Sequence, residues 1–297
     1  MGYQLVERFN GIFLLKILVL LAALLFTALF VFGNEAYLTL VSFFAASIAN
    51  ATAVGGGFLF MPLFIYIYKL APVVALKLSI ATQAFGMTSG ALSWGRQYID
   101  RKAFIVASTA SILGVWFASF IWVVPSSYIK PLFAIISLGV FIALVLEMKY
   151  KEARGAGFFS LLFNTSSMFF VISTFIGGLI TGWTAIGVGE VVALYLLFVY
   201  RLNVDVAIGT GVAVLAASSI AGFVFHIILG GIPWDLLIFT VPGVILGGCY
   251  GAKLAKHLES RGGTTESVNI KPASPLKLFF AAVILIDCIV IFLLEIG

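Results

Sequence analysis

Long apolar stretches, separated by short polar segments, run through almost the whole chain. Most are long enough to cross the hydrocarbon core of a membrane as a helix, which needs about 20 residues. Four are short or marginal and form two consecutive pairs. The pattern predicts an all-α integral membrane protein in which two helix pairs are interrupted. The stretches lie at about 12–32, 37–54, 57–69, 73–94, 103–123, 131–147, 166–184, 190–200, 205–229, 235–252 and 276–294.

A glycine-rich break divides each short pair, at Gly55-Gly56-Gly57 and at Gly187-Val188-Gly189. The two breaks lie 132 residues apart, and the same offset aligns 68–70 (Tyr-Lys-Leu) with 200–202 (Tyr-Arg-Leu) without a gap. The sequence therefore predicts one transporter domain over 1–297, built from an N-terminal span within 1–36 and two repeats at 37–150 and 165–297.

The basic residues predict the orientation of these segments. We place the N-terminus on the cytoplasmic side and let each broken pair enter and leave the membrane by the same side. Of the 17 basic residues, only Lys69, Lys77 and Lys130 then lie on the outer side. This agrees with the positive-inside bias. Each repeat then crosses the membrane an odd number of times, so the repeats have inverted topology, a common plan of secondary transporters. The number of crossings is odd whether each pair is a re-entrant hairpin or crosses the membrane fully twice, so both alternatives remain open. The polar segment 255–275 is predicted to be a cytoplasmic loop.

Composition supports a lipid environment. Hydrophobic residues make up 62% of the chain and charged residues 10%, against about 25% charged residues in soluble domains. The net charge is +5, and most basic residues lie in short loops, where they indicate topology. Lipid is therefore an expected partner, and nucleic acid is not. Cys249 and Cys288 lie in apolar stretches without metal-ligand spacing, and no motif calls for a cofactor.

The glycine breaks are the first candidate site. An interrupted helix survives in a membrane only where protein or a water-filled cavity satisfies its free backbone groups, and the N–H groups of a new helix attract anions. The alternative is that the glycines only permit close helix packing, and that the neighbouring hydroxyls only cap helix ends. The candidate substrate-binding residues are Asn50, Thr52, Gly55, Gly56, Gly57, Ser79, Gln83, Thr184, Gly187, Gly189, Thr210 and Ser218.

Two acids inside apolar stretches, Glu190 and Asp287, are candidates for proton coupling, because an ionisable residue within a membrane usually has a function. Glu190 directly follows the second break and would also stabilise a helix start there. As an ionised carboxylate it would oppose an anion at that break. Lys77 is expected to extend towards the outer interface, and the lone His226 to be structural.

The stretch from Ala53 to Leu63, AVGGGFLFMPL, resembles the glycine-rich signature of the sulfite exporter TauE/SafE family. So do Gly178, Gly182, 187–189 and 207–211 (Ala-Ile-Gly-Thr-Gly) in the second half, and the glycines after Pro242. The resemblance implies a multi-pass permease of the cell membrane that handles sulfite, sulfonates or related organosulfur anions with proton or ion coupling. The chain departs from the family pattern at Glu190 and Leu194.

The sequence contains no nucleophile motif, metal cluster or phosphate loop of the kind found in enzymes. It therefore predicts a secondary transporter of a small anion, with an N-terminus in the cytoplasm, that works by alternating access and is coupled to protons or ions. An uncoupled anion channel using the same site remains a first alternative. A membrane enzyme or assembly subunit is a weaker one.

Overall fold

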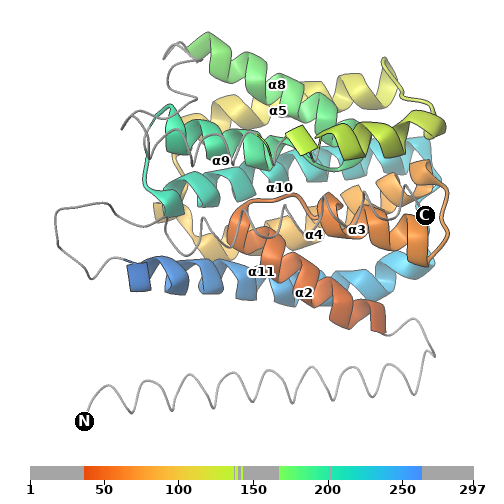
Figure 1. Cartoon of the computed structure of the whole chain (residues 1–297), viewed down its shortest axis with the longest axis horizontal. Helices are drawn as coiled ribbons and strands as arrows, with labels where there is room; N and C mark the ends of the chain where they lie inside the picture. Colours follow the sequence, from red (N-terminus) through yellow and green to blue (C-terminus); the bar gives the residue numbers. More distant parts are fainter. Residues whose placement is uncertain (1–36, 137, 140–141, 143–166, 201, 263–297) are drawn as a thin grey trace.

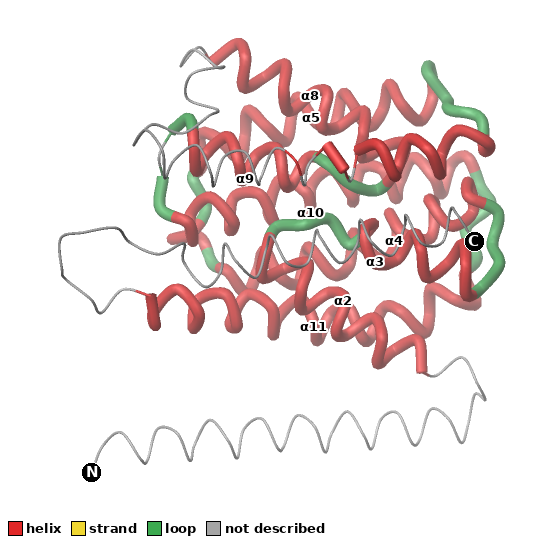
Figure 2. Tube along the Cα trace, viewed as in Figure 1, coloured by secondary structure: helices red, strands yellow, loops and turns green. Residues whose placement is uncertain are grey.

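The structure is a computed structural model that describes residues 37–136, 138–139, 142, 167–200 and 202–262 (Figures 1 and 2). Among these residues it is all-helical. The elements are α2 (Tyr37–Thr52), α3 (Gly57–Pro62), the π-helical turn η2 (Leu63–Ile67), α4 (Pro72–Trp94), the 3₁₀ turn η3 (Arg96–Tyr98), α5 (Arg101–Phe120), α8 (Ser167–Thr184), α9 (Val188–Phe198), α10 (Val204–Leu229) and α11 (Trp234–Gly262). A further apolar helix spans Ser126–Ile136.

Both interrupted pairs are hairpins, whose first and last residues lie together. In the first hairpin (37–68), the ring of Tyr37 at the start stacks on the ring of Tyr68 at the end, with centroids 6.2 Å apart. In the second hairpin (167–200), Phe170 near the start lies against Tyr195 and Tyr200 near the end, with centroids 5.0 Å and 5.7 Å apart. Each pair therefore returns to the side from which it starts.

The hairpins open toward opposite ends of α10. The second hairpin leads directly into the N-terminal end of α10 at Val204. The first hairpin begins beside α11, which follows the C-terminal end of α10, because Thr39 donates a hydrogen bond to the carbonyl of Phe239 at 2.7 Å. Figure 1 shows α2 beside α11 and α8 beside α5, with α4 and α10 between these two pairs.

Small residues let the long helices approach closely, as is usual in membranes. Along α11, Gly243, Gly247 and Gly251 face the backbone of α2 one turn after another, and a Cβ atom at any of them would collide with it. α5 and α8 pack in the same manner through Gly114, Gly178 and Gly182. Three helices are long and apolar enough to span a membrane among the residues described: Arg101–Phe120, Val204–Leu229 and Trp234–His257.

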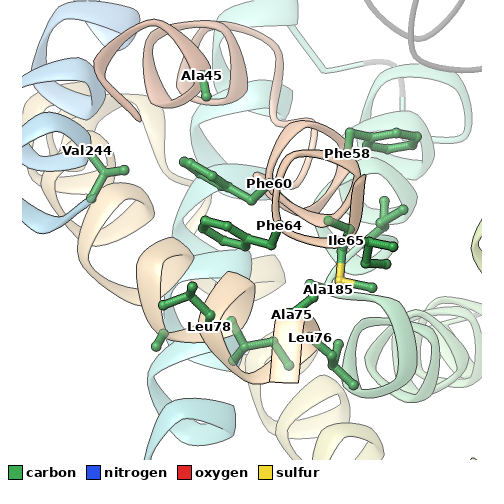
Figure 3. Packing of buried hydrophobic residues seen from close by; sticks show 14 of the residues in the cluster. Ala45, Phe58, Phe60, Phe64, Ile65, Ala75, Leu76, Leu78, Ala185 and Val244 are labelled. Carbon is green, nitrogen blue, oxygen red and sulfur yellow. The ribbon is translucent and has the colours of Figure 1, made fainter. Parts of the chain in front are cut away.

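A cluster of buried apolar side chains fixes the returning arm of the first hairpin against its neighbours (Figure 3). Phe60 and Phe64 stack with ring centroids 5.7 Å apart, and both are almost completely buried. The cluster joins α3 and η2 to α4, α11 and the second break, so it holds the tip of the hairpin in place. Its labelled members in Figure 3 are Ala45, Phe58, Phe60, Phe64, Ile65, Ala75, Leu76, Leu78, Ala185 and Val244.

One predicted boundary differs from the structure. The helix α11 continues through Gly262, whereas a loop was predicted from residue 255. Ala255 is buried and Lys256 packs against aromatic rings, so tertiary contacts extend the helix beyond its apolar stretch. The predicted N-terminal span within 1–36, the rest of the polar loop and Asp287 lie outside the described residues.

Candidate functional site

The tips of the two hairpins lie against each other between α4 and α10. A Cβ atom at Gly55 would lie 3.0 Å from the carbonyl oxygen of Ala185, and one at Gly189 would lie 2.6 Å from the carbonyl oxygen of Ala53. At Gly189 the backbones themselves are in contact, so glycine is required for close approach, whereas at Gly55 a side chain would be a tight fit. The residues 53–58 and 184–190 are all buried, and both breaks are closed to solvent in this conformation.

The chain turns at each break through an alanine in the left-handed region. Ala53 has φ 60° and Ala185 has φ 61°, and these two positions are 132 residues apart. An L-residue in this region costs about 1–2 kcal/mol. The same uncommon conformation thus ends the first arm of both hairpins.

Glu190 joins the two breaks. The N–H of Gly55 in the first hairpin donates to its Oε1 at 2.6 Å, and the N–H of Gly187 in its own hairpin donates to Oε2 at 3.0 Å. The side chain is completely buried. A buried carboxylate is tolerated only when hydrogen bonds compensate its lost hydration, and here backbone donors from both hairpins supply them. The carboxylate of Glu190 therefore occupies the position between the breaks at which the sequence predicts an anionic substrate.

Gln83 on α4 holds the start of α3. Its Oε1 accepts from the N–H of Gly57 at 3.2 Å, and its Nε2 donates to Ser219 Oγ on α10 at 2.7 Å. The amide thereby links the first break to both central helices. Gly55, Gly57, Gly187, Gly189, Gln83 and Glu190 come together as one site, with Gly56 beside them.

The other predicted residues have separate partners. Thr52 and Thr184 donate to carbonyls one turn back in their own helices, those of Ile48 and Ile180, and Thr52 also accepts from the N–H of Val54 at 3.3 Å. Of these contacts, only the one between Thr52 and the N–H of Val54 satisfies a free backbone group, as a cap does. Asn50 donates to the carbonyls of Ala46 and Gly86. The hydroxyl of Thr210 accepts from the N–H of Asp100. The hydroxyl of Ser218 contacts the hydroxyl of Ser111 and donates to the carbonyl of Val214.

Ser79 is fully buried, and its hydroxyl has no hydrogen-bond partner among the described residues. It lies one turn from Gln83 on the same helix and outside the hydrogen-bonded group at the breaks. The oxygen Oδ1 of Asn50 likewise lacks a partner within the described part of the chain.

Sequence reasoning missed Thr181. Its hydroxyl accepts from the N–H of Val188 at 3.1 Å and donates to the carbonyls of Gly177 and Ile186 at 2.8 Å and 3.0 Å. It therefore caps α9 from within α8. The offset of 132 residues places Thr181 opposite Ala49, so comparison of the two halves does not single it out.

The hydrogen bonds at the two tips define what the site can do chemically. Backbone N–H groups of both hairpins converge on acceptor oxygens: those of Gly55 and Gly187 on Glu190, and that of Gly57 on Gln83. In this conformation a carboxylate of the chain itself and an amide oxygen satisfy those donors. An external anion can bind the same N–H groups only if Glu190 moves away or loses its charge.

Comparisons with known proteins identify the family of the chain. The model of the family Sulfite exporter TauE/SafE matches residues 38–291. A relative from Bacillus subtilis (strain 168), named Probable membrane transporter protein YunE, is 21% identical over 247 residues, which cover 75% of this chain and 89% of the relative. No solved structure matches the chain at a significant level.

Proposed function

Because the chain belongs to the sulfite exporter TauE/SafE family and is a membrane transporter, we propose that it carries a small anion together with a proton. The expected substrates are sulfite, sulfonates or related organosulfur anions. The observation that carries the proposal is the position of Glu190, whose carboxylate accepts hydrogen bonds from Gly55 and Gly187, one at each break.

Two repeats of inverted topology form the proposed architecture. Three observations support it beyond the sequence offset: the paired left-handed alanines at 53 and 185, the hairpins that open to opposite ends of α10, and the matched helix contacts. α2 packs on α11 as α8 packs on α5, and α4 packs on α11 as α10 packs on α5. The site lies where the proposed repeats meet, as in many transporters.

The end of α10 near Val204 is proposed to face the cytoplasm, with the N-terminus on the same side of the cell membrane. The described basic residues at that end include Arg96, Arg101, Lys102, Lys253 and Lys256, while Lys69, Lys77 and Lys130 belong to the opposite end. The cytoplasmic ends of membrane helices carry the larger number of basic residues.

Coupling follows from competition between two negative charges. An anion that shares the N–H groups with an ionised Glu190 would lie about 4 Å from it, where two unit charges repel by about 4 kcal/mol at an effective dielectric constant near 20. That repulsion corresponds to a loss of affinity of roughly three powers of ten. A proton on Glu190 removes the repulsion and also frees one backbone donor, because a protonated oxygen no longer accepts as well. Anion binding and proton binding therefore favour each other.

This linkage sets the direction of coupling. Since the anion binds best when Glu190 is protonated, anion and proton cross the membrane in the same direction. After both have left, the ionised Glu190 returns to the backbone donors and stabilises the empty, closed state. Alternating access is proposed to come from displacement of the hairpin tips relative to α4 and α10. Asp287 is proposed as a second proton carrier.

The test uses the purified full-length protein in proteoliposomes with labelled sulfite, thiosulfate and sulfoacetate. An inward proton gradient is expected to drive uptake of at least one of these anions above its equilibrium distribution. Glu190→Gln keeps the side-chain size and is expected to allow only equilibration. The matched control is Asp205→Asn, because Asp205 also accepts a backbone N–H at a helix start, at 2.8 Å, but lies at the end of α10 away from the breaks.

Accumulation by the wild type and the Asp205 variant, lost in the Glu190 variant, is the expected result. Equilibration by the wild type itself would identify an uncoupled channel and contradict the coupling. The absence of flux for all three anions would contradict the assigned substrate class.

A further inference from the structure

His226 near the C-terminal end of α10 is an unusual buried group. Only 4% of its side-chain surface is exposed, and neither ring nitrogen has a hydrogen-bond partner among the described residues. A buried polar group without a partner costs about 1–3 kcal/mol, and buried polar side chains in proteins are nearly always paired. The site described above does not use this side chain.

A second unpaired group lies at the same level on α5. The two helices run parallel, because Ser111 hydrogen-bonds Ser218 at 2.7 Å and Val115 packs on Gly222 one turn later. One further turn brings Ser119 level with His226. Ser119 is 6% exposed, and its hydroxyl also lacks a partner in the described part of the chain.

A third unpaired polar side chain, Ser79, lies on α4. Gln83 bonds Ser219, and Ile80 lies against Gly222, so the two helices run antiparallel. Ser79 lies one turn from Gln83 toward the end where His226 lies. It is fully buried, and its hydroxyl is unpaired within the described residues. By this register Ser79 is level with Phe223, so three helices bring three unpaired polar side chains to within about one helical turn of one another.

Lys77 makes this region electropositive. Its ammonium donates to the carbonyl of Gly230, one turn beyond His226, at 2.7 Å. Asp235, the acidic side chain described at this end of the bundle, is exposed. The local charge therefore favours an anion over a cation.

We propose that His226, Ser79 and Ser119 form a second binding site for a small oxyanion, on the side of the membrane where Lys77 lies. The imidazole N–H and the two hydroxyls supply the hydrogen bonds, and Lys77 attracts the ion to the entrance. This inference rests on the proposed function, because the anion bound there is the one that travels to or from the site at Glu190.

The two sites are connected along α10. Ser219 lies about two turns before His226 and binds Gln83, which in turn binds the N–H of Gly57 at the first break. An anion released from the hairpin tips toward the Lys77 end would therefore meet His226 and its neighbours next. The second site gives the ion hydrogen bonds after it leaves the backbone donors and before it reaches water.

The chain contains two histidines, which makes a direct test possible. The full-length protein, labelled with ¹³C only in histidine, is placed in lipid nanodiscs and titrated with sulfite. The signal of His226 is expected to shift in a saturable manner. The signal of His257, which is exposed on α11, is expected to stay constant, and its loss in His257→Gln assigns the two signals.

Two serine variants of α5 provide a matched pair. Ser119→Ala is expected to raise the sulfite concentration for half of the His226 shift about tenfold, since it removes a hydrogen bond to a charged group. Ser108→Ala also removes a buried, unpaired hydroxyl, but one about three turns away, and is expected to leave the titration unchanged.

The outcomes separate this inference from the proposed function. A saturable His226 shift without sulfite flux in proteoliposomes would support the second site and contradict transport of sulfite. Flux with no change at His226 would overturn the second site and leave the transporter intact. Equal effects of the two serine variants would also overturn it, because they would reflect packing instead of binding.

Discussion

The contact between the hairpin tips makes Gly189→Ala the most informative packing variant. The new Cβ atom would lie 2.6 Å from the carbonyl oxygen of Ala53 and 3.0 Å from Cδ2 of Leu215. Ordinary contact begins at 3.4 Å, so the Ala53 oxygen must retreat by about 0.8 Å. The oxygen belongs to the backbone of a turn that is already left-handed and cannot move without shifting the first break.

The expected cost has two parts. Overpacking in a tightly packed interior costs about 1–3 kcal/mol. Displacing the first break also lengthens the hydrogen bond from Gly55 to Glu190, and a hydrogen bond to a charged group contributes about 1.5–3 kcal/mol. The variant should therefore lose about 2.5–6 kcal/mol of unfolding free energy and most of its transport rate.

Reversible unfolding of the purified protein in mixed micelles measures the first quantity, and proteoliposome uptake measures the second. Gly139→Ala is the matched control, because a Cβ atom there meets nothing within 4 Å; it should change stability by no more than about 1 kcal/mol. Wild-type stability and transport in Gly189→Ala would show that the tips do not pack as described.

Two other substitutions probe contacts around the site. Gln83→Leu leaves the N–H of Gly57 without an acceptor and should lower the unfolding free energy by about 1–3 kcal/mol, measured in the same micelles; no loss would mean that another group accepts from Gly57. Lys256→Met removes an ammonium that donates to two carbonyls at the end of α4 and lies over the rings of Trp94 and Tyr98. It should cost about 1–2 kcal/mol, and the loss should be independent of sulfite.

The helices and their interruptions could be predicted from the sequence because each depends on local properties. Apolar length sets where a span runs, and the glycine runs at 55–57 and 187–189 mark where it stops. The end of α11 could not be found in this manner. Its last turns are polar, and contacts such as that of Lys256 with the ring of Tyr98, 4.8 Å from the centroid, extend the helix.

The candidate site was predictable in its residues but not in its connections. Glu190 was recognised as an acid beside a break, with capping as one reading and proton coupling as another. The structure adds that the same carboxylate reaches Gly55, 135 residues away, which no local pattern reveals. Thr210 and Ser218 share the polar character of Gln83, yet they face α5 and the loop before it. Which face of α10 meets the breaks depends on packing of the whole bundle.

The central claim is that Glu190 and the transported anion compete for the same backbone donors. Equilibrium binding of labelled thiosulfate, which keeps its charge across the neutral range, tests it most directly when proton uptake is measured in the same titration. The account predicts that the wild type takes up close to one proton for each anion bound, and that Glu190→Gln takes up none. Anion binding by the wild type without proton uptake would contradict it.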